Sequence, residues 1–161
     1  MTGRPTLGRM AYVSQEARQH LLDTVAEATE AIGTALAVLG AAYEQVDDAT
    51  ADRLEEQLFR PVQLAFGRAR RTYSGFAGRH GLPDRTFAPG SAGPPSHDVR
   101  VLLGRAADAV TEADLILTEL QDSMLPVEVG DAELRAGLAE VREILADLGE
   151  RARDLVRVIG R

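Results

Sequence analysis

The stretch from residue 21 to residue 46 reads LLDTVAEATEAIGTALAVLGAAYEQV. Apolar residues recur in it with alternating steps of four and three, which places them on one face of a long helix. They are Leu21, Val25, Ala28, Ile32, Ala35, Leu39, Ala42 and Val46. No residue between positions 31 and 43 is charged. We therefore expect this helix to be buried on more than one side.

Three further stretches show this spacing, the second of the four helices only loosely around Pro61. The sequence therefore predicts four helices at about 14–46, 50–80, 96–125 and 131–160. No segment shows the two-residue alternation typical of a strand. These observations predict an all-α fold, an antiparallel up-down-up-down four-helix bundle. An alternative is a pair of helical hairpins that open and pair with a second chain.

The predicted domain organisation is a flexible N-terminal lead-in over residues 1–13 and a single four-helix-bundle domain over 14–161. The expected N-caps are Ser14 for the first helix, Asp48 or Thr50 for the second, Ser96 for the third and Asp131 for the fourth. Pro61 is expected to kink the second helix. The loop over 81–96 holds four Pro and three Gly. Its single aromatic residue, Phe87, is expected to hold this loop against the bundle.

The two halves of the chain share a sequence pattern at an offset of 82 residues. Six residues of the first half, Ser14, Glu16, Arg18, Thr29, Glu30 and Ala31, recur as Ser96, Asp98, Arg100, Thr111, Glu112 and Ala113. This pattern suggests a duplicated helical hairpin. Chance matches between common residue types are the competing interpretation.

Composition narrows the class of protein. The chain has 161 residues, of which 45% are apolar, a net charge of −7 and no Cys. This is enough apolar material for a core, and the acidic balance argues against general nucleic-acid binding. The longest uncharged run falls short of the roughly 20 residues of a membrane span. We expect a cytoplasmic protein, and the absence of Lys and Asn beside abundant Ala, Gly and Arg is typical of a GC-rich, bacterial genome.

The residue patterns of the common bundle enzymes are missing. A di-iron site needs Glu three residues before His on two helices, and none of His20, His80 and His97 has this neighbour. Without Lys there is no phosphate-binding loop of the usual kind, and there is no Gly-x-Ser-x-Gly. We therefore predict no catalytic residues, no metal and no cofactor.

Charge is unevenly distributed along the chain. Residues 60–85 hold six Arg and one Asp, a local charge of +5, which leaves −12 for the remainder. Arg side chains suit carboxylate and phosphate groups. The predicted partner-binding site on this segment consists of Arg68, Arg71, Arg79, His80 and Arg85. The alternative interpretation is a solvated face near a helix C-terminus.

Small residues on the outer side of the first helix predict a second contact surface. They are Ala26, Gly33, Ala37 and Gly40, with Val38 beside them. Gly inside a helix costs about 0.5–1 kcal/mol relative to Ala, and close approach of another helix would offset this cost. This stripe is the predicted self-association face of a homodimer.

Two functions follow, in order of preference. The first is a non-enzymatic cytoplasmic interaction or regulatory module with a protein partner. The second is a small-molecule-binding bundle with its ligand in a core lined by seam alanines, because each Ala in place of Leu forgoes roughly 2–3 kcal/mol of burial. These alanines are Ala28, Ala35, Ala42, Ala65, Ala69, Ala106 and Ala113.

Overall fold

The computed structural model describes residues 6–159, with side chains from residue 14 onward. Most of this range is helical and none of it forms a strand, which confirms the all-α prediction. The helices are α1 (Thr6–Tyr43), α2 (Asp48–Leu54), the π-helix η1 (Glu55–Phe59), α3 (Arg60–Arg79), α4 (Val99–Asp122), α5 (Leu125–Val129), α6 (Ala132–Leu145) and α7 (Leu148–Ile159).

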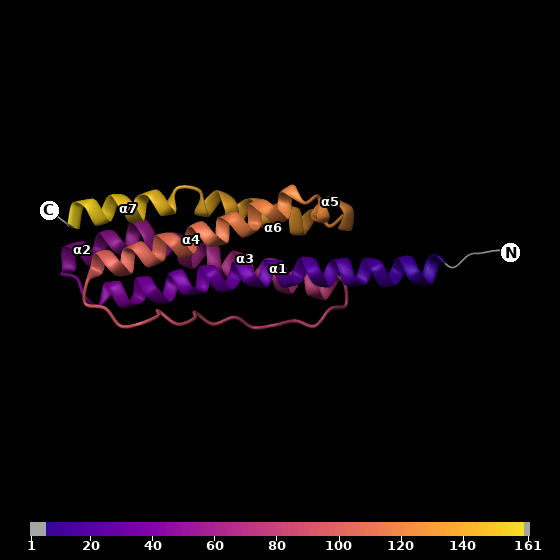
Figure 1. Ribbon diagram of the computed structural model, residues 1–161, viewed down its shortest axis with the longest axis horizontal. Coiled ribbons are helices and arrows are strands. Elements are labelled where there is room, and N and C mark those ends of the chain that lie inside the picture. Colours follow the sequence, from indigo (N-terminus) through magenta and orange to yellow (C-terminus); the bar gives the residue numbers. More distant parts are fainter. Residues whose placement is uncertain (1–5, 160–161) are drawn as a thin grey trace.

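Four long rods lie side by side (Figure 1). They are α1, the continuous α2–η1–α3 helix, α4, and α6 followed by α7. α1 packs most extensively against α4 and also contacts α3, while α6 covers α3 and α7 covers α4. The N-terminal part of α1 extends past the end of the bundle (Figure 1).

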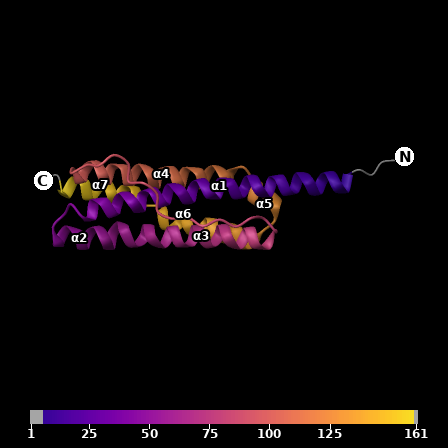
Figure 2. The same cartoon turned by 90° about the horizontal axis from the view of Figure 1, so that it is seen from below.

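The order of helix directions differs from the predicted up-down-up-down arrangement. The segment after α3 runs back along the whole bundle before α4 begins, so α3 and α4 point the same way (Figures 1 and 2). Its contacts with α1 and the turn after it follow in order: Arg85 pairs with Glu30, Gly90 lies beside Thr34, and His97 approaches Gln45. The rods therefore run up, down, down and up.

The length of this crossover segment, residues 80–98, accounts for the difference. An extended chain advances about 3.3 Å per residue, whereas a helix rises only 1.5 Å. Nineteen extended residues therefore span more than the 24 residues of α4. The prolines keep the segment extended, and Arg105 holds it by donating hydrogen bonds to the carbonyls of Ala92 (3.2 Å) and Pro94 (2.6 Å).

Helix starts match the predicted positions only in part. α1 begins at Thr6, so the predicted N-cap Ser14 lies inside the helix and the expected lead-in is helical from Thr6 onward. Residues 1–5 of that lead-in lie outside the described residues. Asp131 caps α6 as predicted, accepting a hydrogen bond from the Leu134 amide at 2.8 Å. The expected break between the first two helices is also present.

The N-caps of α2 and α4 are also aspartates, but each lies one or two residues from the predicted position. Asp47, and not Asp48 or Thr50, caps α2, where its carboxylate accepts from the Thr50 amide at 2.8 Å. Asp98, and not Ser96, caps α4 by accepting from the Arg100 amide at 3.0 Å.

The π-helix η1 directly precedes Pro61, where the sequence predicts a kink. In η1 the Arg60 amide bonds to the Glu55 carbonyl, five residues back. Proline has no N–H, so it cannot donate to the carbonyl of Gln57, four residues back. The Arg151 side chain of α7 donates to that carbonyl at 3.3 Å. The irregular turn is thus tied to a neighbouring helix.

The predicted fourth helix is divided in the structure. α6 ends at Leu145 and α7 begins at Leu148, and a short helix, α5, precedes both. Met124 and Gly130 flank α5 with left-handed backbone angles, φ 66° and φ 77°. Gly adopts this conformation without steric cost, whereas Met does so at some cost.

The alanine seam lies in the core between the rods. Each of its seven alanines is at most 5% exposed. Alanine allows neighbouring helices to approach closely, which explains the extensive contact of α1 with α4. Over Ser14–Tyr43, α1 is long and apolar enough to cross a membrane by length and composition alone, and 67% of its most apolar window is buried in the bundle. This burial is what a core helix requires.

Candidate functional site

The arginine-rich face predicted from the sequence lies on the second half of α3 and on the crossover segment. Arg68, Arg71 and Arg79 follow helical steps of three and four along the edge of α3 that borders α6. Arg70 lies on the other edge, and Arg85 approaches it from the crossover segment. The five arginines therefore surround α3 rather than form one flat patch.

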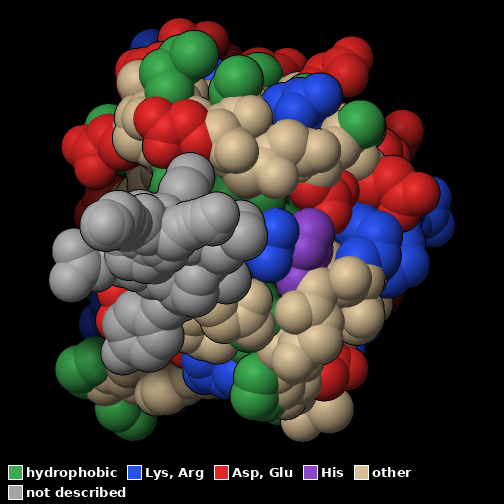
Figure 3. All heavy atoms as spheres, turned by 90° about the vertical axis from the view of Figure 1, so that its right-hand side faces the viewer, with side chains coloured by type: hydrophobic (Ala, Val, Ile, Leu, Met, Phe, Trp, Pro, Cys, Tyr) green, Lys and Arg blue, Asp and Glu red, His purple; other side chains and the backbone are tan. Residues whose placement is uncertain are grey.

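Arg79 and His80, at the end of α3, are bound to α6. The Arg79 guanidinium forms two hydrogen bonds to the Asp131 carboxylate, at 2.8 and 2.9 Å, and a third to Glu133 at 2.7 Å. The Nε2 atom of His80 lies 2.8 Å from Oδ2 of Asp131, the same oxygen that accepts from Nε of Arg79. Figure 3 shows basic, acidic and histidine side chains gathered on this end of the molecule.

Asp131 is the centre of this cluster, and its side chain is only 6% exposed. Burial alone would raise the pKa of its carboxyl group, but hydrogen bonds from Arg79, the Leu134 amide and His80 outweigh burial and lower the pKa to about 2. The same contact raises the pKa of Arg79. The Asp131 carboxylate and the Arg79 guanidinium therefore stay ionised at neutral pH, and their contact fastens α3 to the start of α6.

Arg68 also forms an ion pair within the chain. Its Nε atom donates to the Glu140 carboxylate of α6 at 2.6 Å. One turn further along α3, the buried Thr72 bonds back to the Arg68 carbonyl at 2.8 Å. Thr72 faces Gly137, where a Cβ atom would lie only 2.3 Å from the threonine Oγ1. The two helices are in close contact here, and Arg68 borders this contact.

Arg85 and Phe87 hold the crossover segment in place. Arg85 forms an ion pair with Glu30 of α1 and lies over the Phe87 ring, 4.6 Å from its centroid. Phe87 is 8% exposed and meets Tyr73 edge-on, with ring centroids 5.0 Å apart. The expectation that Phe87 holds this segment against the bundle is confirmed.

Arg70 and Arg71 differ from the other arginines of this face. Among the ion pairs formed by the described side chains, none includes either residue. Arg70 lies over the Phe66 ring at 4.7 Å and donates to the Phe87 carbonyl at 3.4 Å. Both side chains are exposed. They therefore supply positive charge that forms no direct ion pair with a carboxylate of the described side chains.

These two residues border a surface pocket of about 290 Å³ between α3 and the crossover segment. We call it the arginine pocket; its lining is Gly67, Arg70, Arg71, Ser74, Asp84, Arg85, Thr86 and Phe87. The one carboxylate in it, Asp84, accepts hydrogen bonds from the Ser74 hydroxyl and the Arg85 amide, both at 2.8 Å. Arg71 also borders a second pocket on the α6 side of α3.

The predicted partner-binding residues thus divide into two groups. Arg68, Arg79, His80 and Arg85 are paired with carboxylates inside the chain, so they stabilise the fold, and Arg71 alone stays without such a partner. The sequence prediction omitted Arg70. The four-residue spacing from Phe66 to Arg70, which allows a cation to lie over a ring on a helix, was the signal that could have identified it.

The stripe of small residues on α1 is largely covered by the chain itself. Ala26, Gly33 and Val38 are buried, while Ala37 and Gly40 are half-buried. At Gly33 a Cβ atom would lie 3.1 Å from the Phe66 ring and 3.5 Å from the Ala88 carbonyl. The close neighbours of this glycine are therefore α3 and the crossover segment, so most of this stripe is not exposed for self-association.

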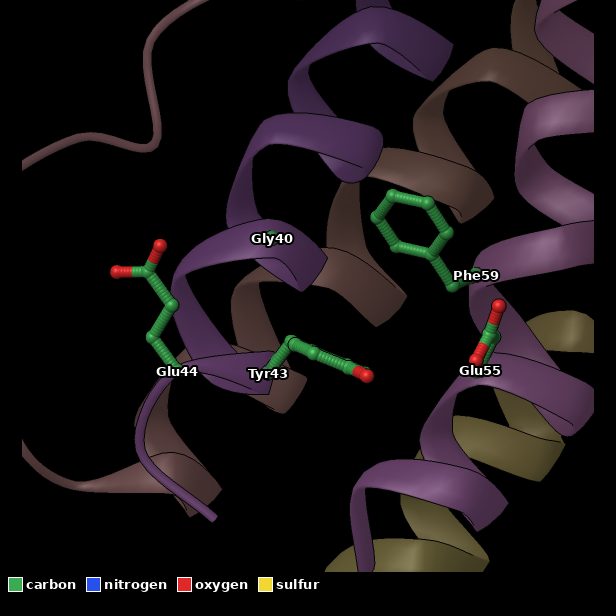
Figure 4. Close-up of a pocket in the computed structure, with 5 residues that line it drawn as sticks. All are labelled: Gly40, Tyr43, Glu44, Glu55 and Phe59. Carbon is green, nitrogen blue, oxygen red and sulfur yellow. The ribbon is translucent and has the colours of Figure 1, made fainter. Parts of the chain in front are cut away.

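Another surface pocket, of about 270 Å³, lies between the C-terminal end of α1 and η1. Gly40, Tyr43, Glu44, Glu55 and Phe59 line it (Figure 4). We call it the π-helix pocket. None of the seam alanines lines this pocket or the arginine pocket. The prediction of a ligand in the alanine-lined core stays a prediction.

Among the described residues, no group of three or more His, Cys, Asp or Glu side chains is placed to hold a metal ion. Comparisons of the chain with protein-family models, with curated proteins and with solved structures find no match. The features that point to a function are the arginine pocket and the π-helix pocket, with the charges around them.

Proposed function

We propose that this protein is a non-enzymatic helical-bundle interaction module, and that its arginine pocket binds an acidic segment of a protein partner. The observation that carries the proposal is the state of Arg70 and Arg71. They are exposed and adjacent, and neither forms a direct ion pair with a described carboxylate, whereas the other arginines of this face are paired within the fold.

The chemistry of the pocket supports a carboxylate ligand. Guanidinium groups bind carboxylates through two parallel hydrogen bonds, and such charge-assisted bonds are stronger than neutral ones. Arg70 is held in place by the Phe66 ring and the Phe87 carbonyl, so less side-chain entropy is lost on binding. A pocket of about 290 Å³ accommodates one or two acidic side chains.

The charge distribution supports the orientation of a partner. The segment 60–85 carries a charge of +5 and the remainder of the chain −12. An acidic segment is attracted to the arginine pocket and repelled elsewhere, which favours specificity and rapid association. Binding of this kind weakens as salt rises.

The expected location is the cytoplasm, and we propose it because burial of α1 within the bundle accounts for the one segment with membrane-like composition. A homodimer is compatible with this function but is not required for it, because the arginine pocket is formed by a single chain.

The experiment uses a fluorescein-labelled peptide that contains six consecutive glutamates, with binding followed by anisotropy at low and at physiological salt. The double charge reversal Arg70→Glu with Arg71→Glu should weaken binding at least about tenfold, since two charge-assisted contacts are replaced by repulsion. Its melting temperature should fall only modestly, because Arg70 loses one contact with the Phe66 ring and one long hydrogen bond to the Phe87 carbonyl. Neither residue pairs with a described carboxylate.

The matched control reverses two exposed arginines outside the pocket, Arg135→Glu with Arg153→Glu, and so changes the net charge by the same amount. It should bind the peptide within about twofold of the original protein, because distant surface charges are screened. Equal weakening in both double variants, or no weakening in the first, would show that the arginine pocket is not the binding site.

A further inference from the structure

Two aromatic rings and a carboxylate line the π-helix pocket, which lies at the end of the bundle opposite Asp131, Arg79 and His80. The Tyr43 ring points from the last residue of α1 toward η1, and the Phe59 ring points back toward α1 (Figure 4). Glu55 lies on the η1 side, whereas the Glu44 carboxylate points away (Figure 4). Tyr43 is 42% exposed, so the pocket is open to solvent.

The pocket exists because of two local features. One is the π-helix itself, whose extra residue per turn sets Glu55 and Phe59 on the side that faces α1. The other is Gly40, one turn before the end of α1. A Cβ atom added there would meet nothing within 4 Å, so the space above it is empty.

The surroundings of the pocket favour a positive ligand. Residues 44–56 hold six acidic side chains and one Arg, a local charge of −5. The last turn of α1 has no basic residue, and the free carbonyls of a helix C-terminus attract cations. Glu55 has a single long ion pair, 3.8 Å to the exposed Arg60, so its carboxylate remains open to another cation.

We propose that the π-helix pocket binds a small organic cation with a methylated ammonium group. Such a group is attracted to the faces of aromatic rings, and an adjacent carboxylate adds charge attraction without requiring a hydrogen bond. A pocket of about 270 Å³ lies just below the usual size range of pockets for drug-sized ligands, which suits a smaller cation. This site is separate from the arginine pocket, and neither proposal depends on the other.

The test is a titration of the uniformly ¹⁵N-labelled protein with tetramethylammonium chloride, with the amide shift of Gly40 as the readout. A saturable shift is expected with the organic cation, and none with sodium chloride at equal ionic strength. Neopentyl alcohol, which has a similar shape but no charge, should bind at least about threefold more weakly, because the cation–aromatic attraction is lost.

Three variants test whether tetramethylammonium binds in this pocket. Glu55→Gln should weaken tetramethylammonium binding at least about threefold. Glu56→Gln removes a charge from the next residue, which is exposed and does not line the pocket, and should leave binding unchanged. Gly40→Leu should abolish binding by filling the empty space, and it should fold because Leu favours a helix more than Gly does.

Three results would each overturn the proposal. They are a linear, unsaturated response to tetramethylammonium, equal binding of the neutral alcohol, and equal weakening in Glu55→Gln and Glu56→Gln. The last would mean that only the general acidic field of this end attracts the cation. Circular dichroism of each variant establishes that it is folded before binding is compared.

Discussion

Arg151 donates a hydrogen bond at 3.3 Å to the backbone carbonyl of Gln57, although 94 residues separate the two in sequence. This carbonyl has no α-helical donor because the residue four positions on is Pro61. Gln57 is exposed, so water is the alternative partner of this carbonyl, and α7 supplies a protein donor where the proline removes one. The bond also fixes the turn that forms one side of the π-helix pocket.

Removal of this contact should destabilise the protein modestly. Arg151→Ala loses the bond to Gln57 and an exposed ion pair with Asp147, at a cost of about 0.5–1.5 kcal/mol. In a Pro61→Ala background the cost should be smaller, because the backbone can then supply its own donor. Urea unfolding of both single variants and the double variant measures this difference. Strictly additive effects would show that the proline and the arginine act independently.

Gly137 should tolerate no side chain. Gly137→Ala places a Cβ atom 2.3 Å from Oγ1 of Thr72, so α3 and α6 must separate, at a cost of about 1–3 kcal/mol. Gly104→Ala on α4 is the matched control, since its Cβ meets nothing within 4 Å, and it should be neutral or stabilising by up to about 1 kcal/mol. Thermal unfolding compares them, and equal stability of the two variants would contradict this packing.

The Asp131 cluster predicts a defined dependence of stability on pH. The pKa of Asp131 is lowered to about 2 in the fold. Its contribution is therefore complete above the unfolded pKa of 3.8 and is lost as the pH falls toward 2. Asp131→Asn keeps a capping side chain but loses the ion pair with Arg79, and should cost about 1–2 kcal/mol at pH 7.

The measurement is the difference in unfolding free energy between the original protein and Asp131→Asn, from pH 7 down to pH 2.5. We expect a constant difference above about pH 5 that shrinks below pH 4. Asp108→Asn, at an exposed position on α4, is the control and should show a small difference throughout. A difference for Asp131→Asn that does not depend on pH would contradict the assigned ion pair.

Phe87 should control the attachment of the crossover segment. Phe87→Ala loses a buried ring and its contact with Tyr73, at a cost of about 2–4 kcal/mol. The segment should then open more often, and trypsin should cleave after Arg85 faster than in the original protein. Phe87→Leu keeps most of the buried area and should largely restore resistance. Unchanged cleavage in Phe87→Ala would mean that other contacts hold the segment.

The alanine-lined core can be tested separately from the surface pockets. Ala35 is fully buried, so Ala35→Leu should overpack the core and destabilise the protein by about 1–3 kcal/mol. Ala37→Leu on the half-buried side of the same helix should have a smaller effect. Stabilisation by Ala35→Leu would indicate an internal cavity and would favour the small-molecule alternative.

The helical periodicity of the sequence was sufficient to predict the class of fold and most of the core. Heptad spacing depends on local geometry, which the sequence records directly. Heptad spacing does not reveal whether a helix runs up or down the bundle. That direction was set by the length of the proline-rich segment and by the contacts that anchor it, such as Arg105 with Pro94 and Phe87 with Tyr73, which helical spacing does not reveal.

The candidate site was predicted in part for a related reason. Clustering of arginine in the sequence located the correct helix, but charge alone does not show which arginines have partners. Glu140 and Asp131, which neutralise Arg68 and Arg79, lie more than 50 residues away in sequence. Likewise, Gly33 indicated a close neighbour, and the neighbour proved to be this chain's own Phe66 rather than a second copy.

The most direct test of the proposed function is where the acidic peptide binds. Amide and arginine side-chain shifts of the ¹⁵N-labelled protein, recorded as the hexaglutamate peptide is added, report the contact residue by residue. We predict that the largest changes gather at Gly67, Arg70, Arg71 and Ser74. Changes spread evenly over the exposed arginines, including Arg135 and Arg153, or centred away from the arginine pocket, would contradict the account.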